Sequence, residues 1–374
     1  MTRRLCLLLV VIATVIAGLI PISPARAAGN APGTVISVTQ RPAGWRDLAD
    51  GGRAVTYWTQ DSRGRPVQAS GALMLPSGTA PAGGWPVVAY THGTSGYGPG
   101  CGGQSFADAS PDKFVSRLID RGYAVVASDY VGLGPMDVGV HPYLDNRSEA
   151  SATIDLLNAS RSIEPRLANR WGVAGGSQGG QAALATAHRQ RTYGPRSDFR
   201  GTVAVDPESD VEKIMPLLGP YIPPVPSPLD DSYGFLLGIL AGLRQADPSV
   251  NVDSYLTPYG RRLVDQVGVT CRSPILPKGL AFGRLLSRPL GTPAMTAALN
   301  RYMAVAVNGY DAPILLILNT LDTTVPSPLH ASLVAQFAAN RVNFSTSVGN
   351  GSHTQLDAAQ WAAFDRFFAT RLKR

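Results

Sequence analysis

The chain has 374 residues, of which 44% are hydrophobic and 16% charged, and its formal net charge at pH 7 is +7. Its basic residues are scattered and form no stripe with interleaved aromatic residues, so the sequence does not indicate a nucleic acid as partner. A chain of this length can form one large domain with an insertion, or two domains.

The first 27 residues have the pattern of a secretory signal peptide. Arg3 and Arg4 form a basic start, residues 5–20 are nearly all apolar, and an Ala-Arg-Ala cleavage site ends at Ala27. The small residues after a short apolar run favour this interpretation over a transmembrane anchor. No later segment reaches the ~18 apolar residues that span a bilayer. We therefore expect a soluble, secreted chain without stable membrane insertion, and at most transient contact with a lipid surface.

The remainder begins with short β-rich runs at 34–38, 54–60 and 67–76. Apolar and polar residues alternate in these runs, and turn residues separate them. This pattern is typical of antiparallel strands.

From residue 86 onward, strands and helices alternate. Strands are predicted at 86–93, 123–129, 171–175, 201–206, 312–319 and 342–348. Helices are predicted at 111–122, 147–163, 178–191, 328–340 and 356–372. The alternation predicts the α/β class, with a mostly parallel central sheet and helices on both of its faces.

Residues 207–310 interrupt this rhythm with long uncharged runs, including 214–229 and 233–243. One interpretation is the buried core of a second domain. The other is an apolar, largely helical cap over a substrate site. Domain cores and apolar pockets use the same residue types, so both interpretations stay open at this point.

Residues 175–179 read Gly-Gly-Ser-Gln-Gly and match the nucleophile elbow G-x-S-x-G around Ser177. The alternative is an ordinary glycine-rich turn. The context favours the elbow, because a predicted strand ends directly before Ser177 and a predicted helix begins directly after it. In that arrangement the hydroxyl stands at the carboxyl edge of the sheet, where α/β proteins bind ligands.

A serine nucleophile needs a general base, and elbow enzymes carry the residues in the order Ser, Asp or Glu, His. His353 follows a predicted strand in a glycine-rich loop and is the candidate base. His188 lies nearly three turns along the helix after Ser177. His330 begins a predicted helix, where we expect it at the surface.

Asp322 is the candidate acid, because it follows the strand at 312–319 at the same sheet edge. Asp311 lies at the opposite end of that strand and is excluded. Asp206 ends the preceding strand and is the second candidate for the acid.

An oxyanion hole needs two donors. We expect the backbone N–H of Gln178, which follows the nucleophile, and that of Thr94, in the loop after an earlier central strand. His92 in the same loop is expected to be a packed structural histidine. The histidines are too scattered to indicate a metal site, and neither a metal nor another cofactor is predicted.

Cys101 and Cys271 are the two cysteines outside the signal peptide. In an exported chain, two cysteines most simply form one disulfide. Two free thiols are the alternative.

Several motifs together resemble the secretory lipase family, the lipase A-type α/β-hydrolases of fungi and actinobacteria. They are "HGT" (92–94), "SDYVGLG" (128–134), "HPYLDNRSEA" (141–150), "GGSQGGQAA" (175–183), "DTTVP" (322–326) and "GSH" (351–353). The resemblance implies an α/β-hydrolase core at 28–206 and 311–374, with the cap at 207–310 inserted before the strand that leads to Asp322. It also implies a disulfide between Cys101 and Cys271.

The resemblance implies a secreted serine esterase or lipase whose substrates are lipid acyl esters or other esters. The same triad on the same fold could instead cleave amides, as in an exported peptidase. A non-catalytic binding protein is the third class, and the intact Ser, Asp and His positions argue against it.

Overall fold

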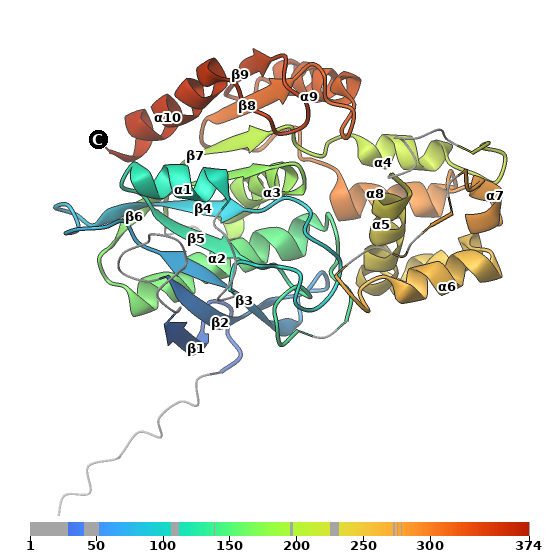
Figure 1. Ribbon diagram of the computed structural model, residues 1–374, viewed down its shortest axis with the longest axis horizontal. Helices are drawn as coiled ribbons and strands as arrows, with labels where there is room; N and C mark the ends of the chain where they lie inside the picture. Colours follow the sequence, from blue (N-terminus) through green and yellow to red (C-terminus); the bar gives the residue numbers. More distant parts are fainter. Residues whose placement is uncertain are drawn as a thin grey trace, which may run out of the picture.

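The computed structural model describes residues 29–40, 52–105, 112–137, 139–194, 197–224, 232–271, 274, 276–277 and 279–373. The predicted signal peptide lies outside the described residues. A nine-stranded sheet in the order β1-β2-β3-β5-β4-β6-β7-β8-β9 forms the centre of the molecule (Figure 1).

The sheet is mixed and mostly parallel, as predicted. Its strands are β1 (Val35–Gln40), β2 (Arg53–Gln60), β3 (Pro66–Met74), β4 (Trp85–Thr91), β5 (Ala124–Ser128), β6 (Leu167–Gly176), β7 (Asp198–Val205), β8 (Ile314–Asn319) and β9 (Phe344–Gly349). The first three pair antiparallel with one another, and β3 also pairs antiparallel with β5. From β5 to β9 every pairing is parallel, so the carboxyl ends of these strands meet at one edge.

Helices cover both faces of the sheet. Helices α1 (Lys113–Asp120) and α10 (Ala358–Leu372) lie on one face, and α2 (Asn146–Ile163), α3 (Gln178–Tyr193) and α9 (Ser327–Ala339) lie on the other. The alternation of side chains along β4 explains the two layers. Val88 and Tyr90 belong to the apolar cluster under α1 and α10, whereas Val87 and Ala89 belong to the cluster under α2.

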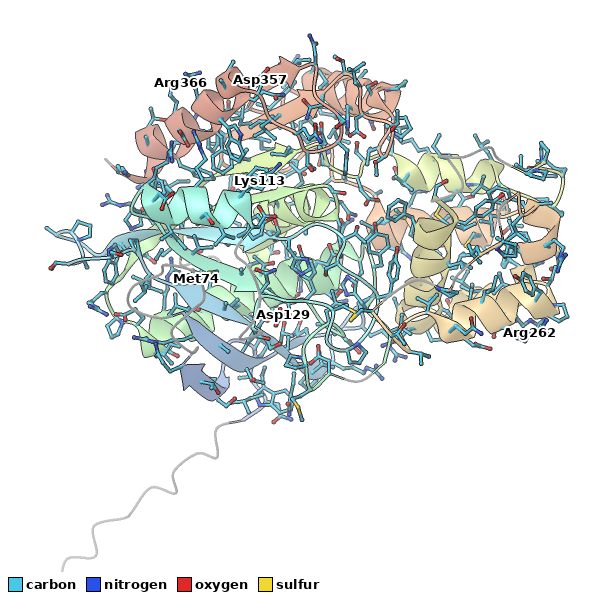
Figure 2. All side chains as sticks on the ribbon, in the orientation of Figure 1. Met74, Lys113, Asp129, Arg262, Asp357 and Arg366 are labelled. Atoms are coloured by element: carbon cyan, nitrogen blue, oxygen red, sulfur yellow. A yellow bond between two sulfur atoms is a disulfide. The ribbon has the colours of Figure 1, made fainter. Side chains whose placement is uncertain are left out.

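A group of helices beside the sheet fills the connection between β7 and β8 (Figure 1). It comprises α4 (Val211–Ile214), α5 (Ser232–Ala246), α6 (Pro258–Gln266), α7 (Phe282–Leu285) and α8 (Pro293–Met303), with 3-10 turns η1 (Met215–Leu217), η3 (Pro248–Val250) and η4 (Val252–Tyr255). In Figure 2, Arg262 on α6 lies among these helices, while Met74, Lys113 and Asp129 lie in the sheet part.

The helical group has an apolar core of its own, which continues into loops of the sheet part. Tyr97 and Tyr143, from the sheet part, are members of this core. The Tyr302 hydroxyl on α8 donates a hydrogen bond to the carbonyl of Tyr143 at 2.8 Å. The loops that carry Tyr97 and Tyr143 therefore join the helical group to the sheet part.

Cys101 and Cys271 form a disulfide, with Cα atoms 5.0 Å apart, which confirms the predicted pairing. It links the loop after β4 to the segment after α6. Among the described residues, no helix is both long and apolar enough to cross a membrane.

Candidate active site

Ser177 stands in a sharp turn between β6 and α3. Its φ is +59° and its ψ is −128°, a backbone conformation that a residue with a side chain rarely adopts. A Cβ on Gly179 would lie 1.9 Å from the carbonyl oxygen of Thr91, and one on Gly175 would lie 2.2 Å from the Thr91 hydroxyl. Only glycine therefore allows α3 to pass this close to β4. This is the strand–turn–helix context that the elbow motif requires.

His353 and Asp322 meet at the carboxyl edge of the sheet. Asp322 follows β8, His353 follows β9, and Nδ1 of His353 lies 2.6 Å from Oδ2 of Asp322. The carboxylate can only accept, so Nδ1 carries the proton, and Nε2 keeps its lone pair. Nε2 of His353 has no hydrogen-bond partner among the described residues. This is the tautomer that a general base needs.

Asp322 is held by four donors. Its Oδ1 accepts the backbone N–H groups of Thr324 at 2.9 Å and Val325 at 3.0 Å, and its Oδ2 also lies 3.2 Å from Nε2 of His330. Burial alone would raise the pKa of Asp322, but the hydrogen bonds of His330 and His353 outweigh it and lower that pKa. Asp322 is therefore ionised across the neutral range.

The negative charge around His353 affects the pKa of its imidazole. Burial alone would lower its pKa, but the hydrogen bond to Asp322 and the charges of Asp322, Asp206 and Glu208 raise it above its ordinary value. The imidazolium form of His353 is thus stabilised relative to that of a free histidine.

Asp206, the second candidate for the acid, has a different set of partners. Its carboxylate accepts the backbone N–H of Asn319 at 2.8 Å, the side-chain amide of Asn319 at 2.7 Å and the backbone N–H of Thr354 at 2.8 Å. Thr354 follows His353 in the chain. Asp206 therefore fixes the loop that carries His353, and Asp322 is the carboxylate hydrogen-bonded to the imidazole.

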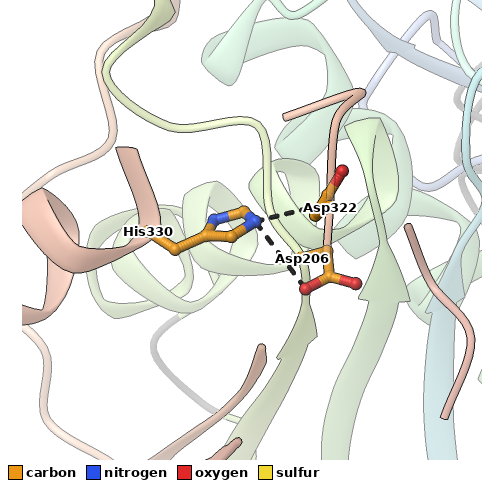
Figure 3. Close-up of side chains that lie close together, drawn as sticks. All are labelled: Asp206, Asp322 and His330. Carbon is orange, nitrogen blue, oxygen red and sulfur yellow. Dashed lines mark hydrogen bonds and ion pairs between the residues drawn. The ribbon is translucent and has the colours of Figure 1, made fainter. Parts of the chain in front are cut away.

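The expected surface position of His330 is wrong. His330 is 2% exposed, and its Nε2 faces Asp322 and Asp206, at 3.2 and 3.7 Å (Figure 3). The first turn of α9 folds back onto the end of β8, which brings the imidazole under the carboxylate eight residues earlier.

Asp206, Asp322 and His330 are also close enough together to be considered as metal ligands. A metal would need the lone pair of Nε2, which would leave the proton on Nδ1. Nδ1 of His330 is buried without a hydrogen-bond partner among the described residues. Both carboxylates, moreover, already accept backbone N–H groups. The cluster fits a hydrogen-bonded network better than a cation site.

Gln178 and Thr94, the two candidate oxyanion donors, stand differently to Ser177: Gln178 follows it in the chain, and Thr94 belongs to the loop after β4. Gln178 begins α3, where its backbone N–H has no acceptor one turn earlier in the helix. Thr94 lines the same cavity of about 290 Å³ as Ser177 and His353. Thr94, Ser177 and His353 thus line one space, whereas Gln178 is buried and adjoins it only as the neighbour of Ser177 in the chain.

The side chain of Gln178 is fixed by hydrogen bonds to two buried residues, His141 and Glu149. Its Nε2 lies 2.8 Å from Nε2 of His141 and 2.8 Å from Oε1 of Glu149, all three residues being buried. Nδ1 of His141 donates to the carbonyl of Val131, so its Nε2 accepts from Gln178. Burial lowers the pKa of His141 to about 4 and raises that of Glu149. The lowered pKa leaves the imidazole of His141 neutral near pH 7, and the hydrogen bonds to His141 and Glu149 fix the side chain of the residue that follows Ser177.

Glu208 connects the site to the helical group. The hydroxyl of Tyr143 donates to Oε1 of Glu208 at 2.7 Å and lies 2.9 Å from the hydroxyl of Thr94. Burial raises the pKa of Glu208 to about 7, although the hydrogen bond from Tyr143 and the charge of His353 act in the opposite direction. The two hydrogen bonds of the Tyr143 hydroxyl thus link the Thr94 loop to Glu208, at the start of the connection between β7 and β8.

A second, apolar cavity of about 450 Å³ adjoins the first. Phe235 and Thr324 line both cavities, so the two spaces meet at these side chains. Among the described residues that line the apolar cavity, Glu208 is the only charged one. The other lining residues come mainly from α4, α5 and the loop after β8. A long apolar group can therefore extend from Ser177 towards the helical group.

His92 is packed as expected. It is 4% exposed, stacks on Tyr130 with ring centres 4.3 Å apart, and has its Nδ1 2.7 Å from the carbonyl of Gly93. These contacts fix the start of the loop that carries Thr94.

The family model of the secretory lipases matches residues 106–221. This confirms the resemblance, and the matched segment contains Ser177 and ends before Asp322 and His353. No curated protein sequence matches the chain.

Solved structures extend the likeness over most of the chain. The rice cell wall degrading esterase LipA from Xanthomonas oryzae is 21% identical, with a TM-score of 0.67 over 91% of this chain and 95% of that chain. Lipase A from Candida antarctica is 18% identical, with a TM-score of 0.67 over 86% of this chain and 78% of that chain. These similarities establish the α/β-hydrolase fold.

Four polar residues of the site were not indicated by the sequence: His141, Tyr143, Glu208 and the buried His330. Each is brought to the site by a loop or helix whose course depends on tertiary packing. The one available signal was the composition of "HPYLDNRSEA", which places a histidine, a tyrosine and acidic residues in one short stretch.

Proposed function

We propose that the protein is a carboxylic ester hydrolase in which Ser177 is the nucleophile, His353 the general base and Asp322 the orienting acid. The observation that carries the proposal is the 2.6 Å hydrogen bond between Asp322 and Nδ1 of His353, at a cavity that Ser177 also lines from an elbow. The match to the secretory lipase model supports the same reaction class.

In the first half-reaction, Oγ of Ser177 attacks the ester carbonyl while Nε2 of His353 takes its proton. The negative oxygen of the tetrahedral intermediate accepts hydrogen bonds from the backbone N–H groups of Gln178 and Thr94. Each such donor contributes roughly 3 kcal/mol in a site from which water is excluded. The intermediate collapses, the C–O bond breaks, and His353 returns its proton to the leaving alcohol.

In the second half-reaction, water attacks the acyl-enzyme. His353 takes a proton from the water, the bond to Oγ breaks, and the proton passes back to Ser177. Asp322 stays ionised throughout and stabilises the imidazolium. The sequence of steps requires no metal or other cofactor.

The apolar cavity supports acyl esters as substrates. We propose that residues 207–310 act as a cap whose cavity takes the acyl chain, entering past Phe235 and Thr324. Each buried methylene contributes about 0.8 kcal/mol, so chain length should affect binding strongly.

We further propose that the mature chain begins near Ala28 and acts outside the cell. The disulfide between Cys101 and Cys271 and the secretory lipase match support an extracellular location. Leu217 and Tyr221, which are exposed in the proposed cap, are suited to transient contact with a lipid surface.

A panel of nitrophenyl esters, triglycerides and an aminoacyl anilide tests the proposal. We expect hydrolysis of the esters, inhibition by a fluorophosphonate and little cleavage of the anilide. Cleavage of the anilide faster than of any ester would support the peptidase alternative instead. Tight ligand binding without turnover would support a binding protein.

A further inference from the structure

His330 is a buried polar side chain to which the reaction scheme above gives no role. It lies in the first turn of α9, with Nε2 at 3.2 Å from Oδ2 of Asp322 and 3.7 Å from Oδ1 of Asp206. A buried imidazole between two carboxylates is costly unless it forms hydrogen bonds with them. Its placement therefore calls for an explanation beyond packing.

The environment of the two ring nitrogens identifies the tautomer. Nδ1 of His330 has no hydrogen-bond partner among the described residues, whereas Nε2 faces carboxylate oxygens (Figure 3). A lone pair on Nε2 would repel these oxygens, and a proton on Nδ1 would be a buried donor without an acceptor. The proton therefore resides on Nε2 and is donated to Asp322.

Oδ2 of Asp322 consequently accepts from two imidazoles, His330 at 3.2 Å and His353 at 2.6 Å. Oδ1 accepts from two backbone N–H groups of the same loop. The backbone hydrogen bonds fix Oδ1 of Asp322. Without His330, Oδ2 would be held by the imidazole of His353 alone.

We propose that His330 is a positioning residue, which fixes the orientation of Asp322 and shares the charge that Asp322 presents to His353. The proposal rests on the proposed function, because it concerns the same Asp–His pair. It assigns His330 no contact with substrate.

Two consequences follow for the reaction. Without the donor, Asp322 loses one of its four hydrogen bonds and holds His353 less firmly, so kcat should fall. The undivided charge of Oδ2 would also act on His353 and raise its pKa. Because His353 must be neutral to act as base, the acidic limb of the kcat/KM profile should move to higher pH. Among the described residues, the other ionisable groups near the pair are Asp206 at the end of β7 and Glu208 in the loop that follows it. Asp112 and Lys113 at the start of α1 line the same cavity as His353.

The test compares His330→Leu, which removes the donor, with His330→Gln, whose amide can donate in its place. For His330→Leu we expect kcat to fall on the order of 10-fold, with KM nearly unchanged. Its acidic limb should move up by about half a pH unit. His330→Gln should recover most of kcat and most of the shift.

Gln336→Leu is the matched control on the same helix. Gln336 donates to the buried carboxylate of Asp210, at 2.9 Å to Oδ2, and lines neither of the two cavities of the site. Its loss should lower thermal stability and leave the pH profile unchanged. An equal shift in this variant would show that α9 acts only through stability and would overturn the proposal.

Two further outcomes would overturn it: an unchanged profile and kcat in His330→Leu, or equal losses in the Leu and Gln variants. If His330→Leu does not fold, the tautomer decides, because ¹⁵N NMR of the intact protein should show His330 protonated at Nε2. Protonation at Nδ1 alone would contradict the proposal. Ser177→Ala separates the two proposals: esterase activity that survives it defeats the proposed function and leaves the NMR test standing.

Discussion

The sheet part and the helical group differ in the side chains that they place around the site. The carboxyl edge of the sheet is rich in buried polar side chains, among them Asp206, Asp322 and His330, each hydrogen-bonded to a neighbour. The helical group has an almost wholly apolar core and borders an apolar cavity. Directional hydrogen bonds fix reacting atoms to within fractions of an ångström, whereas non-directional apolar contacts accept a range of chain shapes. Substitutions at the edge should therefore change kcat, and substitutions around the cavity should change chain preference.

Ser177→Ala tests the first half of this comparison most severely. The variant should fold normally and lose on the order of 10⁴-fold or more in turnover, because it removes the attacking oxygen. A fluorophosphonate should label the wild type and leave the variant unlabelled. Full labelling of the variant would place the nucleophile elsewhere.

Asp322→Asn should lower turnover on the order of 10⁴-fold, because an amide holds His353 in the wrong tautomer. Asp206→Asn is the matched control at the same sheet edge. It should affect turnover much less, since Asp206 bonds to the backbone of Thr354 and not to the imidazole. Reversed magnitudes in steady-state kinetics would make Asp206 the catalytic acid.

The disulfide joins the two regions, so its loss should affect both. In the chain-entropy model, a bond closing a loop with a sequence separation of 170 stabilises the folded state by up to about 5 kcal/mol. The double variant Cys101→Ser, Cys271→Ser should melt at a lower temperature. It should also lose more activity on long-chain esters than on acetate, because the bond links the Thr94 loop to the helical group.

Peptide mapping without reduction provides the direct check of this link. The peptides containing Cys101 and Cys271 should migrate as one species. Two free thiols in the exported protein would remove the tether.

Val211→Trp tests the second half of the comparison. Val211 lines the apolar cavity, and the larger side chain should fill part of it. Long-chain esters should lose on the order of 10-fold in kcat/KM, while acetate should be hydrolysed as before. Val269→Trp is the control, because Val269 is 74% exposed in the same helical region. Equal losses on acetate and long-chain esters would mean that the acyl chain lies elsewhere.

The smallest expected effect concerns stability in the sheet part. Burial raises the pKa of Asp155 to about 7, despite hydrogen bonds from Thr59 and Tyr193. The folded state therefore retains a proton that the unfolded chain releases at lower pH. The stabilisation from this group is full below about pH 4 and is lost as the pH rises towards 7.

In Asp155→Asn, the melting temperature should depend less on pH between about pH 4 and pH 7 than it does in the wild type. Asp120→Asn, at an exposed position, serves as control and should not change the slope. A slope that is unchanged in Asp155→Asn would show that other groups dominate the pH dependence of stability.

The sequence predicted local geometry better than tertiary placement. The elbow around Ser177 was predictable, because the glycines at 175 and 179 are dictated by a close backbone approach within a few residues. The strands and helices of the sheet part were predictable from their alternation. The meeting of Asp322 and His353 was predictable because both residues follow parallel strands that end at the same edge.

The helical group and His330 show where prediction fails. The uncharged run of α5 fits a domain core and a cavity wall equally well, since both bury the same residue types. His330 stands in a segment rich in serine and proline, with no sign of burial. Only the return of α9 over the end of β8 brings its imidazole to Asp322, and that return depends on packing between distant segments.

The position of the helical group in the chain has a consequence for how such enzymes diversify. Because β7 and β8 are parallel neighbours, the chain must travel back along the sheet between them, and α4 to α8 make that crossover. The whole group is thus a single insert whose two ends, after Val205 and before Ile314, belong to adjacent strands. A segment of another length and composition could be grafted after Glu208 and before Ile314 without changing the order of any strand, and Asp206 would still fix the loop of His353. A chimera built at these junctions should exchange substrate preference as one module, while Ser177, Asp322 and His353 stay in place.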